Sequence, residues 1–188
     1  MSFEEIEEKY NLLINIAKEE MLSIKDNEHD IHHMEDVVNF TKEILEKMKL
    51  QDVNREVCII GAYWHDVGRT KLNDGHEKVS ANMLKEQMEK MNYDEDFISK
   101  CIRVIEFHRW DMNPETIEGK IVKDADKLAW IGSGRWKACI KNKQRLDSIM
   151  DKLYMLRNEI LYFDCSREIY DKQIIIILKI LYENIYKE

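Results

Sequence analysis

The stretch VCIIGAYWHDVGRT, residues 57–70, decides the fold of this chain. Its first eight residues are almost all apolar, which is typical of a segment that crosses the middle of a folded core. His65 and Asp66 follow at once, although an imidazole and a carboxylate are costly to bury without partners. Gly68 then supplies a helix end. The stretch therefore predicts a buried helix that ends in a polar pair, and the partner of that pair is either a metal ion or a surface turn.

The rest of the chain also predicts helices. It has 188 residues, 44% of them hydrophobic, with one proline and six glycines, so it can bury the core of a single domain. Few helix breakers and apolar residues at helical spacing favour an all-α fold, a compact helical bundle. Ser2 with Glu5 predicts a capping box, and Asp74 and Asp94 predict further helix starts. The expected helices cover about residues 2–23, 33–49, 54–67, 74–91, 94–108 and 116–131, followed by two long helices.

Composition argues against several classes of partner. The 37 acidic and 29 basic side chains give a net charge of -8, which argues against a nucleic acid duplex as partner. The longest strongly apolar run, residues 174–178, is far shorter than the roughly 20 residues that span a bilayer. The four cysteines form no CxxC pair and no secretory leader is recognised, so they are expected to be free thiols. The sequence therefore predicts a soluble, cytoplasmic protein without membrane association.

Ionisable residues lie on the apolar faces of several predicted helices. His33, His108 and Asp126 each continue an apolar stripe at helical spacing, which places them on buried faces. A single buried histidine is more often a hydrogen-bonded core residue than a ligand. Two histidines and two aspartates in one core are harder to explain as separate hydrogen-bonded core residues. Their nitrogen and oxygen atoms suit a divalent ion such as Mn²⁺, Fe²⁺, Co²⁺, Ni²⁺ or Zn²⁺.

Three blocks in order carry a family resemblance: HDIHHMEDV at 29–37, AYWHDVGRT at 62–70 and VKDADKLAWIG at 122–132. They resemble the HD-domain superfamily of metal-dependent phosphohydrolases. The resemblance covers about residues 26–140 of a single domain, with 141–188 as a C-terminal helical extension. It implies an HD-type helical bundle and, as metal ligands, His33, His65, Asp66 and Asp126. Asp124 is then either outside the ligand set or a helix start.

Two further blocks resemble the additional histidines of two-metal HD proteins. They are HEKVSANML at 76–84 and FHRWD at 107–111. The resemblance implies that His76 and His108 hold a second ion with Asp66 as a bridge, so the cofactor is one divalent ion or two, with Mg²⁺ also in range. Alternatively, His76 caps a helix and His108 binds substrate or packs in the core. Arg69 stands where HD nucleotidases carry a glutamate, which argues against a 5′-nucleotidase.

The resemblance implies hydrolysis of a phosphoester in a small phosphorylated metabolite, with a nucleotide favoured. Asp66 is then the catalytic residue. Arg69, Lys127 and His108 are the expected substrate-binding residues, and Arg109, Arg135 and Lys137 are weaker candidates. The competing hypothesis is a non-catalytic, metal-containing helical module that binds a nucleotide or a protein partner.

Two regions outside these blocks remain open. His29 and His32 are expected at an exposed helix start, with contact between His29 and the substrate as the alternative. The last helix is apolar nearly all round, and its pattern places Ile169 and Ile176 on one covered face. That helix either packs between the first helix and the penultimate helix or forms part of a homodimer contact, so the protein is expected to be a monomer or a homodimer.

Overall fold

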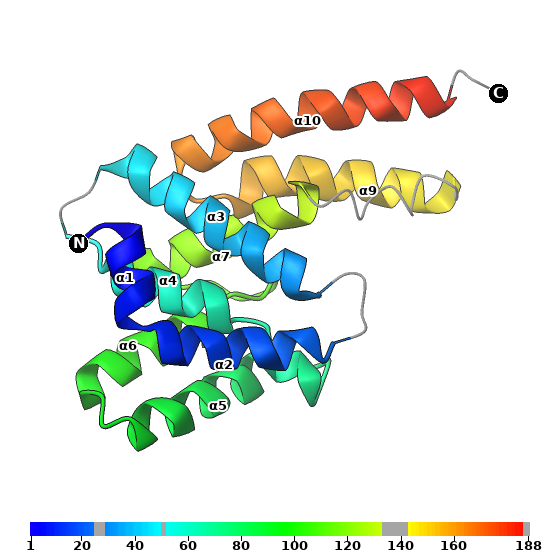
Figure 1. Cartoon of the computed structure of the whole chain (residues 1–188). Helices are drawn as coiled ribbons and strands as arrows, with labels where there is room; N and C mark the ends of the chain where they lie inside the picture. The colour runs from blue at the N-terminus through cyan, green and yellow to red at the C-terminus, as the bar shows by residue number, and fades with distance from the viewer. Residues whose placement is uncertain (25–28, 50–51, 133–142, 186–188) are drawn as a thin grey trace.

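The computed structural model describes residues 1–24, 29–49, 52–132 and 143–185, and within these ranges the chain is helical without strands (Figure 1). The all-α prediction is confirmed. The elements are α1 (Phe3–Lys9), α2 (Asn11–Leu22), α3 (Ile31–Met48), α4 (Arg55–Trp64), a 3₁₀ turn η1 (Val67–Thr70), α5 (His76–Lys90), α6 (Glu95–Glu106), α7 (Ile117–Gly132), α9 (Lys143–Met155), a π turn η2 (Leu156–Ile160) and α10 (Asp164–Ile185).

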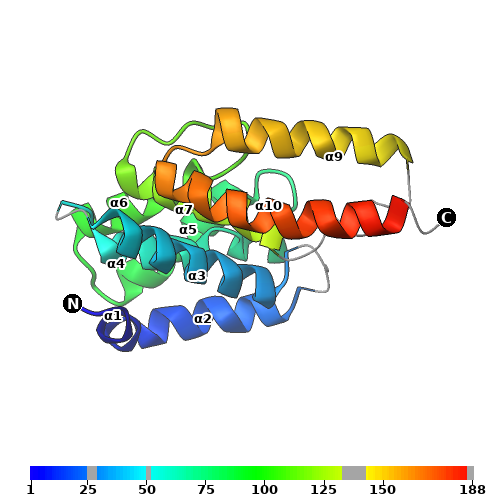
Figure 2. The same ribbon diagram turned by 90° about the horizontal axis from the view of Figure 1, so that it is seen from above.

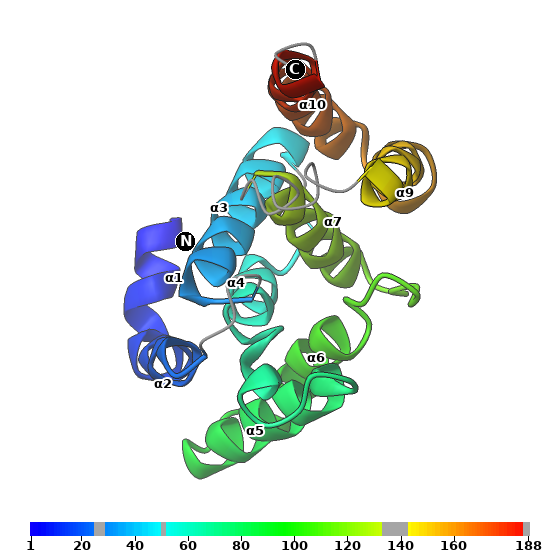
Figure 3. The same ribbon diagram turned by 90° about the vertical axis from the view of Figure 1, so that its right-hand side faces the viewer.

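The central helix of the bundle is α4. Residues 57–64 are all buried, and α4 packs against α3, α6 and α7, which surround it in Figure 3. Gly61 permits the close contact with α6, because a Cβ atom there would lie 2.5 Å from Cγ1 of Val104. Asn54 caps the helix by accepting a hydrogen bond from the backbone N–H of Val57. The helix therefore carries the following residues, His65 and Asp66, into the core.

Local signals at the other helix ends are partly borne out. The capping box of Ser2 and Glu5 is present, and Asp94 caps α6. The single helix expected over residues 2–23 is interrupted at Tyr10, which is buried and hydrogen-bonds to Glu56 of α4. The cap predicted for Asp74 is wrong, because Gly75 with a φ of 81° precedes α5 and provides no side-chain cap. A tertiary contact and a left-handed backbone turn thus override two local expectations.

Helix α10 packs on α7 and α3 and lies beside α9 in Figures 1 and 2. Ile169, Tyr170 and Ile177 form its buried face, as expected for Ile169. Ile176 is 61% exposed, so its predicted place on the covered face is wrong. The expected packing against the N-terminal helix is replaced by packing against α7 and α3. No described helix combines the length and the apolarity needed to cross a membrane.

Candidate metal centre

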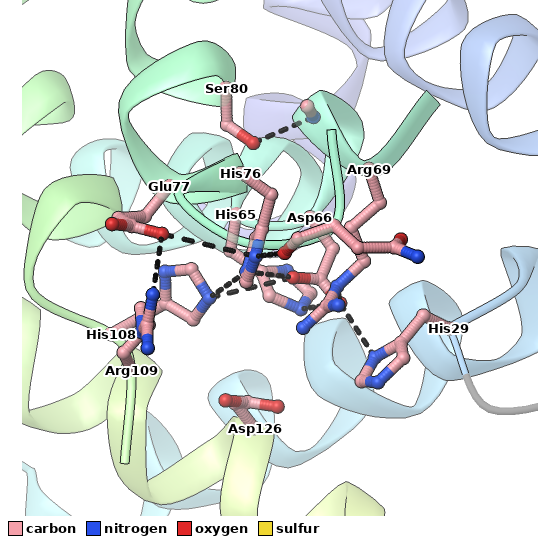
Figure 4. A network of polar contacts seen from close by, with 12 residues as sticks. His29, His65, Asp66, Arg69, His76, Glu77, Ser80, His108, Arg109 and Asp126 are labelled. Atoms are coloured by element: carbon pink, nitrogen blue, oxygen red, sulfur yellow. Dashed lines mark hydrogen bonds and ion pairs between the residues drawn. The ribbon is translucent and has the colours of Figure 1, made fainter. Parts of the chain in front are cut away.

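Six buried ionisable side chains converge beside the C-terminal end of α4 (Figure 4). They come from five parts of the chain: the first turn of α3, the end of α4, the start of α5, the residue pair after α6 and the middle of α7. None is more than 7% exposed. The set consists of His33, His65, Asp66, His76, His108 and Asp126. We call these six residues the His/Asp cluster.

Capping and close packing position the cluster. Asp30 caps α3 by accepting a hydrogen bond from the N–H of His33, which fixes the first turn of that helix. On the other side, the N–H of Gly68 donates to Oγ of Ser80 at 2.7 Å, which ties η1 to α5. A Cβ atom on Gly68 would lie 2.3 Å from the carbonyl oxygen of His76. The absence of a side chain at Gly68 therefore allows His76 to approach Asp66.

The first group of the cluster joins α3, α4 and α7. Nε2 of His33 lies 3.2 Å from Oδ1 of Asp126 and 3.4 Å from Nε2 of His65. Oδ2 of Asp66 lies 3.8 Å from Nε2 of His33 and 3.6 Å from Nε2 of His65. The structure thus brings together all four residues that the family resemblance implied for one ion.

The second group of the cluster lies on the opposite oxygen of the same aspartate. Oδ1 of Asp66 is 2.9 Å from Nε2 of His76 and 3.5 Å from Nε2 of His108. The two histidine nitrogens are 3.2 Å apart. Asp66, His76 and His108 offer ligand atoms close enough to share one metal ion, as do His33, His65 and Asp126. Asp66 therefore stands between two groups of potential ligands.

Hydrogen bonds determine which ring nitrogen faces the cluster. Nδ1 of His65, His76 and His108 lies 2.8, 2.8 and 2.6 Å from the carbonyl oxygens of Ala62, Asn73 and Ile105, respectively. Because a carbonyl only accepts, each Nδ1 carries the proton, and a neutral ring presents the lone pair of Nε2. Oδ1 of Asp66 is buried without a partner of hydrogen-bond geometry among the described residues. Several lone pairs directed at one point are the donor set of a divalent cation, so these residues fit a metal ion.

Charge states in the cluster also suit a cation. Burial lowers the pKa of His65 to about 3, so its imidazole is neutral at pH 7 and can act as a ligand. Burial alone would raise the pKa of Asp66, but the surrounding histidines, His65 first among them, hold it well below its usual range. Asp126 behaves likewise, with Lys127 and His33 outweighing its burial and keeping its pKa low. The centre therefore combines the neutral imidazole of His65 with two ionised carboxylates.

His29 belongs to the site more closely than its sequence position indicated. Its Nδ1 lies 2.9 Å from Oδ2 of Asp66, and His29, His33 and Asp66 form a third group able to hold an ion. The expected exposure is correct for His32, whose side chain is 80% exposed. His29 precedes Asp30, the extended N-cap of α3, so helical spacing gave no signal for this contact.

A pocket of about 560 Å³ opens over the cluster. Its lining includes the predicted substrate-binding residues Arg69, Lys127 and His108. Nε of Arg69 lies 2.9 Å from Oδ2 of Asp66, and Nζ of Lys127 donates a hydrogen bond to Oδ2 of Asp126. Two basic side chains are therefore held at the edge of the candidate metal centre by its own carboxylates.

The weaker basic candidates differ from these two. Arg109 lines the pocket, but its guanidinium faces three carboxylates: Asp74 at 3.0 Å, Asp111 at 3.2 Å and Glu77 at 3.6 Å. Its charge is therefore offset within the protein. Arg135 and Lys137 lie outside the described residues.

Asp124 lies outside the ligand set, which is one of the two places expected for it. It lies inside α7 rather than at a helix start, and its carboxylate accepts hydrogen bonds from the backbone N–H groups of Tyr162 and Phe163. Burial raises its pKa to about 6. Asp124 thus joins α7 to the segment before α10, and Asp126, two residues along, faces the cluster.

Solved structures share this fold. A predicted HD superfamily hydrolase from an uncultured Thermotogales bacterium is 21% identical, with a TM-score of 0.71 over 100% of this chain and 99% of that chain. YpgQ of Bacillus subtilis in complex with ADP is 20% identical, with a TM-score of 0.71 over 95% and 94% of the two chains. An HD-superfamily hydrolase from Bacillus thuringiensis is 17% identical, with a TM-score of 0.72 over 97% of each. At these identities the likeness shows the fold alone.

The sequence matches no curated protein. The HD domain family matches residues 30–131, more than half of the chain and the part that contains the whole His/Asp cluster. The predicted resemblance is therefore confirmed, and the chain belongs to the HD domain family.

Proposed function

We propose that this protein is a metal-dependent phosphohydrolase that acts on a small phosphorylated metabolite, with nucleotides as the favoured substrate class. The position of Asp66 carries the proposal, because its two oxygens face two histidine pairs at a pocket lined by basic side chains. Support for a nucleotide comes from a protein of the same fold, Bacillus subtilis YpgQ, whose structure was solved with ADP.

The proposal assigns two divalent ions to the cluster. His33, His65 and Asp126 would hold one ion and His76 and His108 the other, while Asp66 directs one oxygen to each group. Bound divalent ions lower the pKa of water and offset the charge of a phosphoryl group. Nitrogen and oxygen donors are compatible with Mn²⁺, Fe²⁺, Co²⁺, Ni²⁺, Mg²⁺ and Zn²⁺. Asp66 is the catalytic residue in this scheme because it belongs to both groups.

Arg69 and Lys127 have the role of orienting the substrate phosphate. Each makes one contact with a cluster carboxylate, Arg69 with Asp66 and Lys127 with Asp126. A guanidinium has five N–H donors and an ammonium three, so both retain donors for phosphate oxygens. Charge-assisted hydrogen bonds of this kind offset the charge of the phosphoryl group and fix its orientation.

A phosphoester screen tests the proposal. The purified protein is stripped of metal, reloaded separately with Mn²⁺, Mg²⁺, Co²⁺ or Ni²⁺, and assayed for phosphate release from nucleotides and sugar phosphates. We expect turnover of at least one nucleotide with at least one ion and none after chelation. Binding of a nucleotide by the loaded protein without turnover of any substrate contradicts the proposal and supports a non-catalytic binding module.

A further inference from the structure

Two tryptophans line the same pocket as His33, His76 and Asp126 of the cluster. Trp110 lies in the turn after α6, and Trp130 lies near the C-terminal end of α7. Their ring centroids are 6.4 Å apart and their planes meet at 75°, an edge-to-face pair. Both side chains are half-buried. The pocket therefore continues from a charged end into an aromatic end, and we call Trp110 and Trp130 the tryptophan pair.

Helix α7 sets the distance between the two ends. Trp130 follows Asp126 by four residues and Lys127 by three, so each of them lies one helical turn from Trp130. With a rise of about 1.5 Å per residue, Trp130 lies about 6 Å along the axis from Asp126. The segment after α6 repeats the order, since His108 of the cluster precedes Trp110 by two residues. In both segments a cluster residue is followed by a tryptophan.

A buried lysine fixes the position of Trp110. Lys123 of α7 is 1% exposed, and its ammonium donates hydrogen bonds to the carbonyl oxygens of Trp110, at 3.4 Å, and Met112. Burying an ammonium is costly unless its donors are satisfied, so the lysine and the turn hold each other in place. Trp110 is thus attached to α7, the helix that also carries Trp130.

Basic charge lies between the aromatic end and the cluster. Nζ of Lys127 is 5.7 Å from the ring centroid of Trp110 while it also contacts Asp126. The pocket volume of about 560 Å³ lies within the usual range of roughly 300–1,000 Å³ for small-molecule sites. A ligand complementary to this pocket has a phosphate at one end and a flat unsaturated ring at the other.

We infer that the tryptophan pair is a stacking site for the base of a nucleotide, and that it makes the protein select base-bearing phosphates over base-free ones. The inference rests on the proposed function, since it assumes that the phosphate lies at the His/Asp cluster. Stacking on an aromatic side chain tolerates different bases, because every base has a π-face. The site therefore distinguishes nucleotides from sugar phosphates more strongly than it distinguishes one base from another.

The test compares ligands that differ only in the base. Adenosine 5′-monophosphate and ribose 5-phosphate carry the same phosphoester, and binding of each is measured by titration calorimetry with Ca²⁺ present. The values of kcat/KM are measured separately with Mn²⁺. The proteins are the wild type, Trp110→Leu, Trp130→Leu and Trp130→Phe. Tyr182→Leu, on α10 and 63% exposed, is the aromatic control outside the pocket.

We expect the wild type to bind the nucleotide about tenfold to a hundredfold more tightly than the sugar phosphate, the range for one stacked base. Each leucine variant should reduce this ratio at least fivefold, Trp130→Phe should retain most of it, and Tyr182→Leu should leave it unchanged. Because the readout is a ratio within one protein, a partial loss of folded protein does not imitate the result.

Two further outcomes separate this inference from the proposed function. Base-dependent binding without cleavage of either ligand supports the stacking site, and the phosphohydrolase is then wrong only if the wider phosphoester screen also shows no turnover. Cleavage with equal kcat/KM for both ligands supports the phosphohydrolase and overturns the stacking site. Equal binding of the two ligands, binding of neither, or a ratio that the leucine variants do not change also overturns it.

Discussion

The Asp66→Ala variant is expected to lose bound metal and phosphatase turnover together. The carboxylate lies within 4 Å of ring nitrogens from His33, His65, His76 and His108, so its removal takes a ligand from both groups of the cluster. A bound metal ion contributes several kcal/mol to transition-state stabilisation, and about 1.4 kcal/mol corresponds to a tenfold change in rate, so turnover should fall by about 10³-fold or more. Metal content by elemental analysis and kcat/KM with Mn²⁺ are the two measurements.

Asp124→Asn is the matched control for this variant. Asp124 is also buried in the core, but its carboxylate binds the backbone of Tyr162 and Phe163 instead of facing the cluster. We expect Asp124→Asn to keep the metal content of the wild type while its stability changes. If Asp66→Ala retained full metal and turnover, or if Asp124→Asn lost metal to the same extent, the assignment of Asp66 would be wrong.

Gly68→Ala is expected to cause the largest loss of stability for a single added methyl group. The new Cβ would lie 2.3 Å from the carbonyl oxygen of His76 and 2.6 Å from the backbone nitrogen of Ser80. Because both atoms belong to the backbone of α5, relief of the clash requires η1 and α5 to separate. Overpacking of this kind typically costs about 1–3 kcal/mol, and we expect the free energy of unfolding to fall by about 3 kcal/mol. Urea unfolding measures the change.

Gly132→Ala provides the comparison. A Cβ there would lie 3.4 Å from Cε2 of Phe40 and 3.5 Å from Nε2 of Gln173, which are ordinary contact distances, and the residue ends α7, where alanine favours the helix. Its free energy of unfolding should equal or slightly exceed that of the wild type. If the free energy of unfolding of Gly68→Ala lies within about 0.5 kcal/mol of the wild-type value, the usual range for neutral surface changes, then η1 and α5 are not in the close contact described.

The core of the site was predictable because local chemistry determines it. An apolar run with helical spacing must cross the interior, so the residues that end it, His65 and Asp66, must be buried with partners. The same argument placed His33 and Asp126 on buried faces, and the structure brings all four together. Polar residues on an apolar helix face are a reliable sequence signal, because burying them is unfavourable unless they have hydrogen-bond partners or a common ligand.

Other features of the fold and of the pocket depend on tertiary contacts, which the apolar periodicity of the sequence does not predict. The last helix is apolar on most sides, so its periodicity could not decide that Ile177 would be buried and Ile176 exposed. The helix break lies at Tyr10, which is buried and hydrogen-bonds to Glu56, 46 residues away. The pairing of Trp110 with Trp130 likewise requires the turn after α6 to lie against α7. Contacts between distant segments decide each of these.

The most direct test of the metal centre is anomalous X-ray diffraction from crystals of the protein loaded with Mn²⁺. We predict anomalous density among His33, His65, Asp66 and Asp126, at about 2.0–2.3 Å from their donor atoms, and a second peak beside His76 and His108. Crystals soaked at saturating Mn²⁺ that show these six side chains converging, with no anomalous peak among them, would contradict the account.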